Sequence, residues 1–181
     1  VMNGNVLESS VHWFESEDGT HWCDVRELKA GPEQPNECYL EILPDGTATL
    51  LMRCEEGLKH PYLCRSKAPF DRWTMTRLDD ISITGPSVWT VRGEVYIGVR
   101  WHMMHAEKEC VLWRAQTAIF KVQDGKTQLQ YVLPSGPRFD NSYMGIARHP
   151  DNANRFAITF YSDGIAPSDP TVCQQDKPDI Y

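Results

Sequence analysis

The feature that most constrains the fold is a succession of short apolar stretches separated by turn signals. No long stretch repeats its apolar residues with the helical period of 3.6. Turn signals such as Pro44-Asp45-Gly46 and Arg92-Gly93 divide the chain into short segments. The sequence therefore predicts an all-β chain of antiparallel sheets. The expected strands are 10–16, 22–28, 39–43, 48–53, 62–66, 73–78, 87–91, 94–101, 110–122, 128–133, 142–148, 155–161 and 179–181.

These strands recur in groups of four at a spacing of about 45 to 55 residues, which is typical of propeller blades. So small a sheet cannot bury its faces alone, and radial stacking of blades would cover them. The alternative is a small sandwich in which sheets pack face to face. The expected units are the end of one blade, two whole blades and the start of a last blade, at about 10–30, 37–80, 85–134 and 140–181.

Certain polar residues occupy corresponding places in these units. Arg53 in LLMRCE and Arg100 in YIGVRWH each end a predicted strand. Glu37 lies just before the first whole unit, and Tyr143 opens the last one. In a radial repeat these side chains would meet at a shared centre, where two arginines would bind an anion, most simply a carboxylate. The alternatives are an ordinary surface or ion-paired role for the arginines and Glu37, and a core position for Tyr143.

Three further residues are candidates for the same cleft. Glu55 follows Arg53 closely, and Asp140 precedes Tyr143, although a turn position is the favoured interpretation of Asp140. Five of the six tryptophans are interpreted as packing between sheets. Trp101, which lies beside Arg100, is the exception and is expected to line the cleft.

Composition excludes some classes of protein. A formal net charge of -7 and a pI of about 5.3 argue against nucleic-acid binding, which normally uses a basic face. No apolar run approaches the length of a membrane span. Because the first residue is Val1, a preceding leader or a longer segment is expected to have been removed.

No metal or cofactor is expected. The six cysteines form no CxxC pair, which argues against a zinc site of common spacing. Cys54 and Cys64 flank a predicted hairpin and would either face each other across it or be buried free thiols. His102 and His105 lie close together in the sequence but are not expected to bind a metal. Asp163 and Asp169 are interpreted as residues of a plain loop and not of a calcium site.

The segment SEDGTHW, residues 16–22, fits the Asp-box pattern S-x-D-G-x-x-W. Asp18 and Ser16 are expected to accept hydrogen bonds from turn amides, with Trp22 packed beneath. Together with NECYLEILPDGTATLLMRCE, YLCRSKAPFDRWTMTRL, GPSVWTVRGEVYIGVRWH and NSYMGIARHPDNANRFAITFYSDG, it resembles the sialidase superfamily of BNR-repeat propellers. The resemblance covers nearly all of residues 10–181 and maps to the C-terminal half of a six-bladed domain.

The resemblance implies a glycoside hydrolase that acts on a carboxylate-bearing sugar of a glycan. Arg53 and Arg100 match two of the three arginines that bind the carboxylate, Tyr143 matches the nucleophile, and Glu37 matches its base. A tyrosine nucleophile is a recognised exception to the usual pair of carboxylates. The first arginine and the acid/base aspartate belong to the N-terminal half, which is expected in the same polypeptide or in a separate chain. The compartment implied is extracellular or periplasmic.

Two departures from the family pattern keep other functions open. The last unit has FYSDG where sialidases have a Tyr-Glu pair, and Met144 follows Tyr143. One alternative is a non-catalytic propeller that binds carbohydrate or protein in the same cleft. Another is a structural or assembly module whose exposed sheet edges are covered by a second chain.

Overall fold

The computed structural model describes residues 9–55, 59–107, 110–134, 141–162 and 179–180, and gives only the backbone of residues 102–107, 110–114, 153, 179 and 180. The described chain is all-β, as the sequence predicts, and every strand pairing in it is antiparallel. A 3-10 turn, η1 (Gly31–Glu33), precedes the second sheet.

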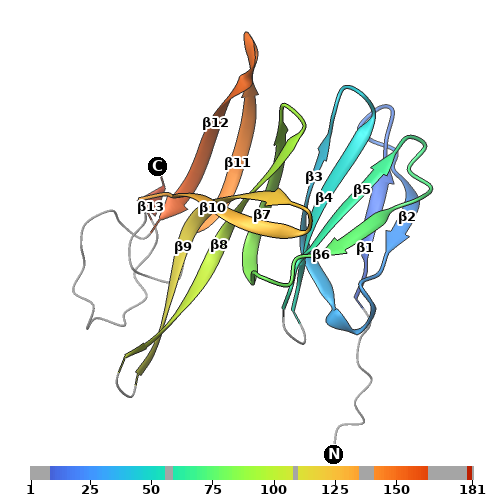
Figure 1. Cartoon of the computed structure of the whole chain (residues 1–181). Helices are drawn as coiled ribbons and strands as arrows, with labels where there is room; N and C mark the ends of the chain where they lie inside the picture. The colour runs from blue at the N-terminus through green and yellow to red at the C-terminus, as the bar shows by residue number, and fades with distance from the viewer. Residues whose placement is uncertain (1–8, 56–58, 108–109, 135–140, 163–178, 181) are drawn as a thin grey trace, which may run out of the picture.

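The strands form four sheets, and within each sheet the spatial order follows the chain (Figure 1). A two-stranded sheet contains β1 (Val11–Glu15) and β2 (Cys23–Leu28). The next has β3 (Pro35–Ile42), β4 (Thr47–Cys54), β5 (Tyr62–Lys67) and β6 (Thr74–Arg77). The third has β7 (Ile83–Val91), β8 (Glu94–Glu107), β9 (Cys110–Gln123) and β10 (Lys126–Val132). The fourth has β11 (Ser142–His149), β12 (Asn152–Ser162) and β13 (Asp179–Ile180).

Tight turns explain why consecutive strands pair. Arg92-Gly93 joins β7 to β8 and Asp124-Gly125 joins β9 to β10, and all four residues have positive φ. Positive φ at both central residues is the signature of the type I′ turn, whose twist matches that of the flanking strands. Local sequence thus favours the β7–β8 and β9–β10 hairpins independently of contacts between sheets.

Several strand boundaries differ from those predicted, and two of the differences concern Glu37 and Arg100. The strand expected at 39–43 begins earlier, at Pro35 of β3, because a register shift between Pro35 and Cys38 lets Pro35 pair with Cys54. Glu37 therefore lies within a strand and not before one. Likewise, β8 continues to Glu107 instead of ending near Arg100, since its pairing with β9 runs without interruption. Arg100 is consequently held within a backbone ladder opposite Thr117, whereas Glu37 lies in the irregular part of β3 between Pro35 and Cys38.

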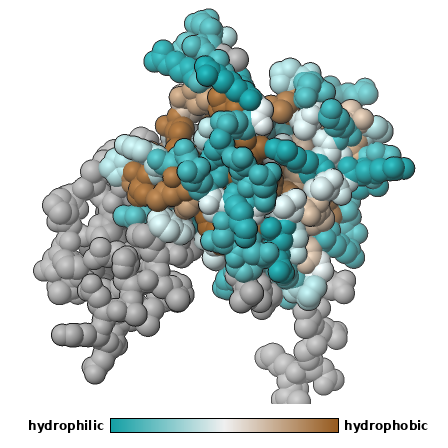
Figure 2. Space-filling view, viewed as in Figure 1, coloured by the Kyte–Doolittle hydropathy of each residue, from teal (hydrophilic) through white to brown (hydrophobic). Residues whose placement is uncertain are grey.

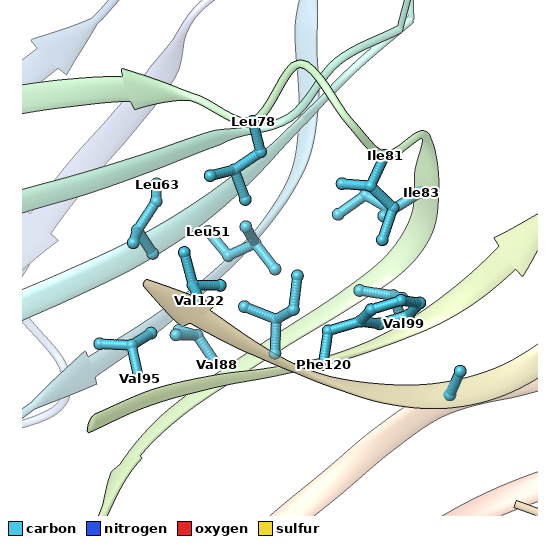
Figure 3. Packing of buried hydrophobic residues seen from close by; sticks show 12 residues of the cluster. Leu51, Leu63, Leu78, Ile81, Ile83, Val88, Val95, Val99, Phe120 and Val122 are labelled. Carbon is cyan, nitrogen blue, oxygen red and sulfur yellow. The ribbon is translucent and has the colours of Figure 1, made fainter. Parts of the chain in front are cut away.

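The main core lies between the two four-stranded sheets (Figure 3). Leu51 of β4 has no exposed surface and packs with Ile97 and Val99 of β8 in one cluster. A second cluster joins the opposite face of the β3–β6 sheet to β1 and β2, through residues such as Leu50 and Met52. Because β4 is covered on both faces, it contains three consecutive buried apolar residues, Leu50 to Met52, in place of a strict alternation.

Of the two interpretations left open for Cys54 and Cys64, the structure supports buried free thiols and not a pair that faces across a hairpin. Cys64 lies opposite Leu50 in the β4–β5 ladder, and Cys54 lies opposite Pro35. Both are buried free thiols, which is the alternative that the sequence left open. Burial raises the pKa of Cys54 to about 11 and that of Cys64 to about 12, so both stay protonated at neutral pH.

The first strands of successive sheets are tied together by side chains. The hydroxyl of Ser87 in β7 donates to the carbonyl of Met144 in β11 at 2.8 Å. Arg148 of β11 donates to Glu41 of β3 and to the carbonyl of Thr90 in β7, each at 3.1 Å. Strands β3, β7 and β11 thereby bring three sheets to one region.

No helix of the described chain has the length and apolarity needed to cross a membrane.

Candidate functional site

Glu37 is the point at which three sheets meet. Its Oε1 accepts a hydrogen bond from the hydroxyl of Tyr143 at 2.6 Å and lies 2.9 Å from Nη1 of Arg53. Its Oε2 accepts the backbone N–H of Gly85 at 2.8 Å. The donors come from β11, β4 and β7, and the carboxylate from β3. One carboxylate therefore satisfies a phenol, a guanidinium and a main-chain amide at once.

Gly85 makes this convergence possible. It lies where the β7–β8 register shifts between Thr84 and Ser87, and its φ is +57°. A Cβ atom at this position would lie 3.3 Å from the backbone nitrogen of Tyr143, closer than an ordinary contact. Glycine thus permits both the left-handed backbone that aims its N–H at Glu37 and the close approach of β11.

Arg53 is shared between two carboxylates. Besides Glu37, it forms an ion pair with Glu55, and Glu55 also accepts from Asn36 at 3.2 Å and from Lys59 at 3.3 Å. The Arg53 side chain is only 17% exposed, so much of its charge is compensated inside the protein. An acidic ligand would have to share this guanidinium with Glu37 and Glu55.

Arg100 reaches the site from the opposite direction. Its Nε donates to the carbonyl of Asn141 at 2.6 Å, and its Nη2 donates to the hydroxyl of Tyr161 at 2.7 Å. The guanidinium lies 5.3 Å from the ring centroid of Tyr143, within the range of a cation–π contact. The rings of Tyr143 and Tyr161 stack 6.1 Å apart at 11°. Arg100 therefore joins the site through its contacts with Tyr143 and Tyr161.

The backbone at Tyr143 is unusual for a side chain of this size. Ser142 has φ of 96° and Tyr143 has φ of 48°, both in the left-handed region that non-glycine residues rarely adopt. Such conformations cost on the order of 1–3 kcal/mol each and persist where surrounding contacts hold them, often at functional sites. Tyr143 is still 50% exposed, so its ring is open to solvent while its hydroxyl is held by Glu37.

The shared proton rests on the tyrosine. The hydrogen bond to Glu37, burial and the charge of Glu37 together raise the pKa of Tyr143, against the opposing effect of Arg100 and Arg53. Burial by itself raises the pKa of Glu37, but the hydrogen bonds from Tyr143 and Gly85 and the charge of Arg53 outweigh it and lower that pKa. At neutral pH the pair is thus a neutral phenol and a carboxylate.

Replacing Glu37 by glutamine is expected to destabilise the protein most at neutral pH and less in acid. Because the pKa of Glu37 is lowered on folding, its carboxylate contributes stability above the ordinary value of 4.5, and that stability is lost as the pH falls below it. Urea unfolding of the wild type and the Glu37→Gln variant between pH 3 and 7, in ~1-unit steps, measures the difference. A constant difference across this range would contradict the assignment.

The structure brings together four of the residues singled out from the sequence, Glu37, Arg53, Arg100 and Tyr143, and adds Glu55 through Arg53. Of the other predicted positions, Asp140, Asp163 and Asp169 lie outside the described residues, as do the side chains of His102 and His105.

Trp101 does not line the cleft as predicted. Its ring packs edge-on against Phe120 at 5.5 Å and contacts the main core. Neighbouring residues of a strand point to opposite faces, so the position of Arg100 at the site directs Trp101 toward the core.

Three residues of this site are not among those predicted from the sequence. Gly85, Asn141 and Tyr161 contact Glu37, Arg100 or Tyr143. The available signal for Gly85 was the Gly85-Pro86 pair directly before the predicted strand 87–91, since glycine and proline next to a strand are typical of bulges and close backbone approaches. Tyr161 is the tyrosine of the FYSDG segment. Nothing in the local sequence distinguishes Asn141 from an ordinary turn residue.

The Asp-box segment forms the turn expected of it, apart from its tryptophan. Ser16 accepts the N–H of Gly19 at 2.8 Å, and Asp18 accepts the N–H groups of His21 and Thr20, each at 2.8 Å. These bonds, led by that of His21, hold the pKa of Asp18 well below its usual range. Trp22, predicted to pack beneath the turn, is instead 60% exposed.

Within the described ranges, no three His, Cys, Asp or Glu side chains gather closely enough to hold a metal ion. The site as described consists of a phenol–carboxylate pair, two guanidinium groups and a second phenol.

Compared with known proteins, the chain matches no protein-family model, no curated protein and no solved structure.

Proposed function

We propose that the cluster around Glu37 and Tyr143 is the binding site for an acidic sugar of a glycan, in a sialidase-like glycoside hydrolase domain. The observation that carries this proposal is the 2.6 Å contact between the Tyr143 hydroxyl and Glu37, with Arg53 and Arg100 both beside the same pair. A phenol that is hydrogen-bonded to a carboxylate and flanked by cations is the arrangement that a tyrosine nucleophile requires.

The proposed chemistry uses the pair as nucleophile and base. The Tyr143 oxygen would attack the anomeric carbon, Glu37 would take the phenol proton, and the bond to the leaving oxygen would break as that oxygen receives a proton from a separate acid. Water would then hydrolyse the tyrosyl–sugar bond. A neutral phenol repels a carboxylate-bearing sugar less than Asp or Glu would. The acid and a third arginine are assigned to a further part of the domain, in the same polypeptide or in a separate chain.

The architecture proposed for this domain is a six-bladed propeller with the sheets as blades. Its support is the placement of β3, β7 and β11, which are the first strands of successive sheets and are cross-linked by Glu37, Ser87 and Arg148. In a propeller the first strands of the blades surround the central axis, where ligands bind.

Binding of N-acetylneuraminic acid, followed by isothermal titration calorimetry, tests the proposal. The wild type is expected to bind it saturably and to bind the neutral sugar N-acetylglucosamine at least ~10-fold more weakly, since a charge-assisted bond to a guanidinium is worth about 1.5–3 kcal/mol. Arg100→Lys is expected to weaken binding by about tenfold, because lysine cannot reproduce a planar fork. Arg65→Lys, on the exposed part of β5, is the matched control and is expected to bind as the wild type does.

Turnover of a fluorogenic sialoside completes the test. Tyr143→Phe is expected to abolish turnover in the complete domain while leaving sugar binding, because it removes the attacking oxygen and keeps the ring. Equal affinity for the acidic and the neutral sugar would overturn the acidic-sugar proposal. Unchanged turnover in Tyr143→Phe would overturn the nucleophile.

One observation favours a non-catalytic carbohydrate-binding site as the second candidate. Glu37 already accepts bonds from three donors, which lowers its pKa and makes it a weak base. The half-exposed ring of Tyr143, stacked on Tyr161, would then serve as a platform for the apolar face of a sugar. Saturable binding in a complete domain that never cleaves a sialoside would favour this function.

A further inference from the structure

Asn141, which directly precedes the two left-handed residues, is fully buried and uses both ends of its side-chain amide. Its Nδ2 donates to the carbonyl of Ala115 at 2.7 Å, and its Oδ1 accepts the hydroxyl of Thr117 at 2.9 Å. Both partners belong to β9, so the amide fastens the start of β11 to a strand of the neighbouring sheet.

The main chain of Asn141 makes a second attachment. Its carbonyl accepts Nε of Arg100 at 2.6 Å, and Arg100 lies directly opposite Thr117 in the β8–β9 ladder. Three bonds from adjacent strands therefore hold one residue. Arg100 also donates to Tyr161, whose ring stacks on that of Tyr143. Asn141 is therefore linked to both tyrosines through the Arg100 guanidinium.

This attachment explains how the backbone conformation next to it is maintained. Ser142 and Tyr143 would relax toward ordinary strand geometry if their neighbour were free to move. Movement of Asn141 would leave a buried amide and a buried hydroxyl without partners, which is costly. The entry to β11 is thus fixed on its N-terminal side by Asn141, and it is fixed beyond Tyr143 by the bond from Ser87 to Met144.

We propose that Asn141 is a positioning residue that holds the Tyr143 hydroxyl against Glu37 and fixes the Arg100 guanidinium beside the Tyr143 ring. The role needs an amide, because the Ala115 carbonyl requires a donor while the Thr117 hydroxyl requires an acceptor. The functional meaning of this positioning rests on the proposed function, whereas the positioning itself is a property of the unliganded protein.

The test follows the ionisation of Tyr143 in protein labelled with ¹³Cζ-tyrosine. The Tyr143 resonance is identified by its absence in Tyr143→Phe. In the wild type its titration midpoint is expected above the ordinary value of 10.0, because the bond to Glu37 favours the protonated phenol. In Asn141→Ala the midpoint is expected to fall toward 10.0 as that bond loosens. Thr117→Val, which removes one of the two amide partners and keeps the shape, is expected to give a smaller fall in the same direction.

Two controls separate positioning from general loss of stability. Thr117→Ser keeps the hydroxyl and is expected to restore the wild-type midpoint. Ser66→Ala removes a hydrogen bond from a buried hydroxyl of β5 to the carbonyl of Arg72, in the segment before β6, and is expected to leave the Tyr143 midpoint unchanged. A fall of equal size in Ser66→Ala would overturn the proposal, since the effect would then be unspecific.

An unchanged Tyr143 midpoint in a folded Asn141→Ala protein would also overturn the positioning role. Should that variant not fold, the comparison of Thr117→Val with Thr117→Ser decides, and equal midpoints in the two would count against the proposal. The outcome does not depend on the ligand. If the midpoint falls as expected while the wild type binds no acidic sugar, the positioning role stands and the proposed function fails.

Discussion

Replacing Leu51 by alanine is expected to lower the free energy of unfolding by about 2–5 kcal/mol. Leu51 has no exposed surface and lies in the cluster that joins the two four-stranded sheets. Truncation would remove buried apolar contacts and leave a cavity that the surrounding ladders prevent from closing. Because the sheet-to-sheet contact brings β3 to β7, the Glu37–Gly85 bond is expected to weaken with it.

Urea unfolding followed by tryptophan fluorescence measures this change. Leu40→Ala is the matched control, since Leu40 lies opposite Leu50 in the same sheet and is 39% exposed. The Leu40→Ala variant is expected to lose much less stability, because truncating a partly exposed side chain leaves little buried cavity. Equal losses in the two variants would show that the described core is not the principal one.

Replacing Gly98 by alanine is expected to destabilise the protein by about 1–3 kcal/mol through overpacking. A Cβ atom there would lie 1.8 Å from Cε of Met144 and 3.2 Å from the ring of Trp89. Met144 is almost fully buried and directly follows Tyr143, so the side chain would have to move together with the entry to β11. We therefore expect the Tyr143–Glu37 contact to be disturbed as well.

A double-mutant cycle with Met144→Ala isolates the cause. The single change at Met144 removes the atoms that the new Cβ would strike, so Gly98→Ala is expected to cost far less in that background. The interaction energy is expected to be about 1–2 kcal/mol, within the range found for residues in contact. Additive losses would mean that Gly98 is required for its backbone and not for the space that it leaves to Met144.

The strands were predictable because their signals are local. Turn pairs such as Arg92-Gly93 and the apolar run of β4 report the hairpin and its burial without knowledge of the rest of the chain. The convergence of Glu37 and Tyr143 was expected from their places in repeating units and from a family resemblance.

What the sequence could not supply depends on register. A register shift at Pro35 placed Glu37 inside β3, and uninterrupted pairing with β9 extended β8 past Arg100. The side on which Trp101 lies follows from this pairing, because a strand alternates its faces. The role of Asn141 could not be predicted for a related reason. Its partners on β9 depend on how two sheets pack together, and the sequence around Asn141 carries no pattern that identifies them.

The Tyr143–Glu37 bond joins residues that are 106 positions apart in the chain. Such long-range contacts form slowly, because the entropy of closing a large loop is lost before the contact repays it. We therefore expect the hairpins within each sheet to close before this bond, which needs the sheets of β3, β7 and β11 to have docked. A partly folded chain would then have strands but no phenol–carboxylate pair, so any function proposed for this pair would depend on completed folding.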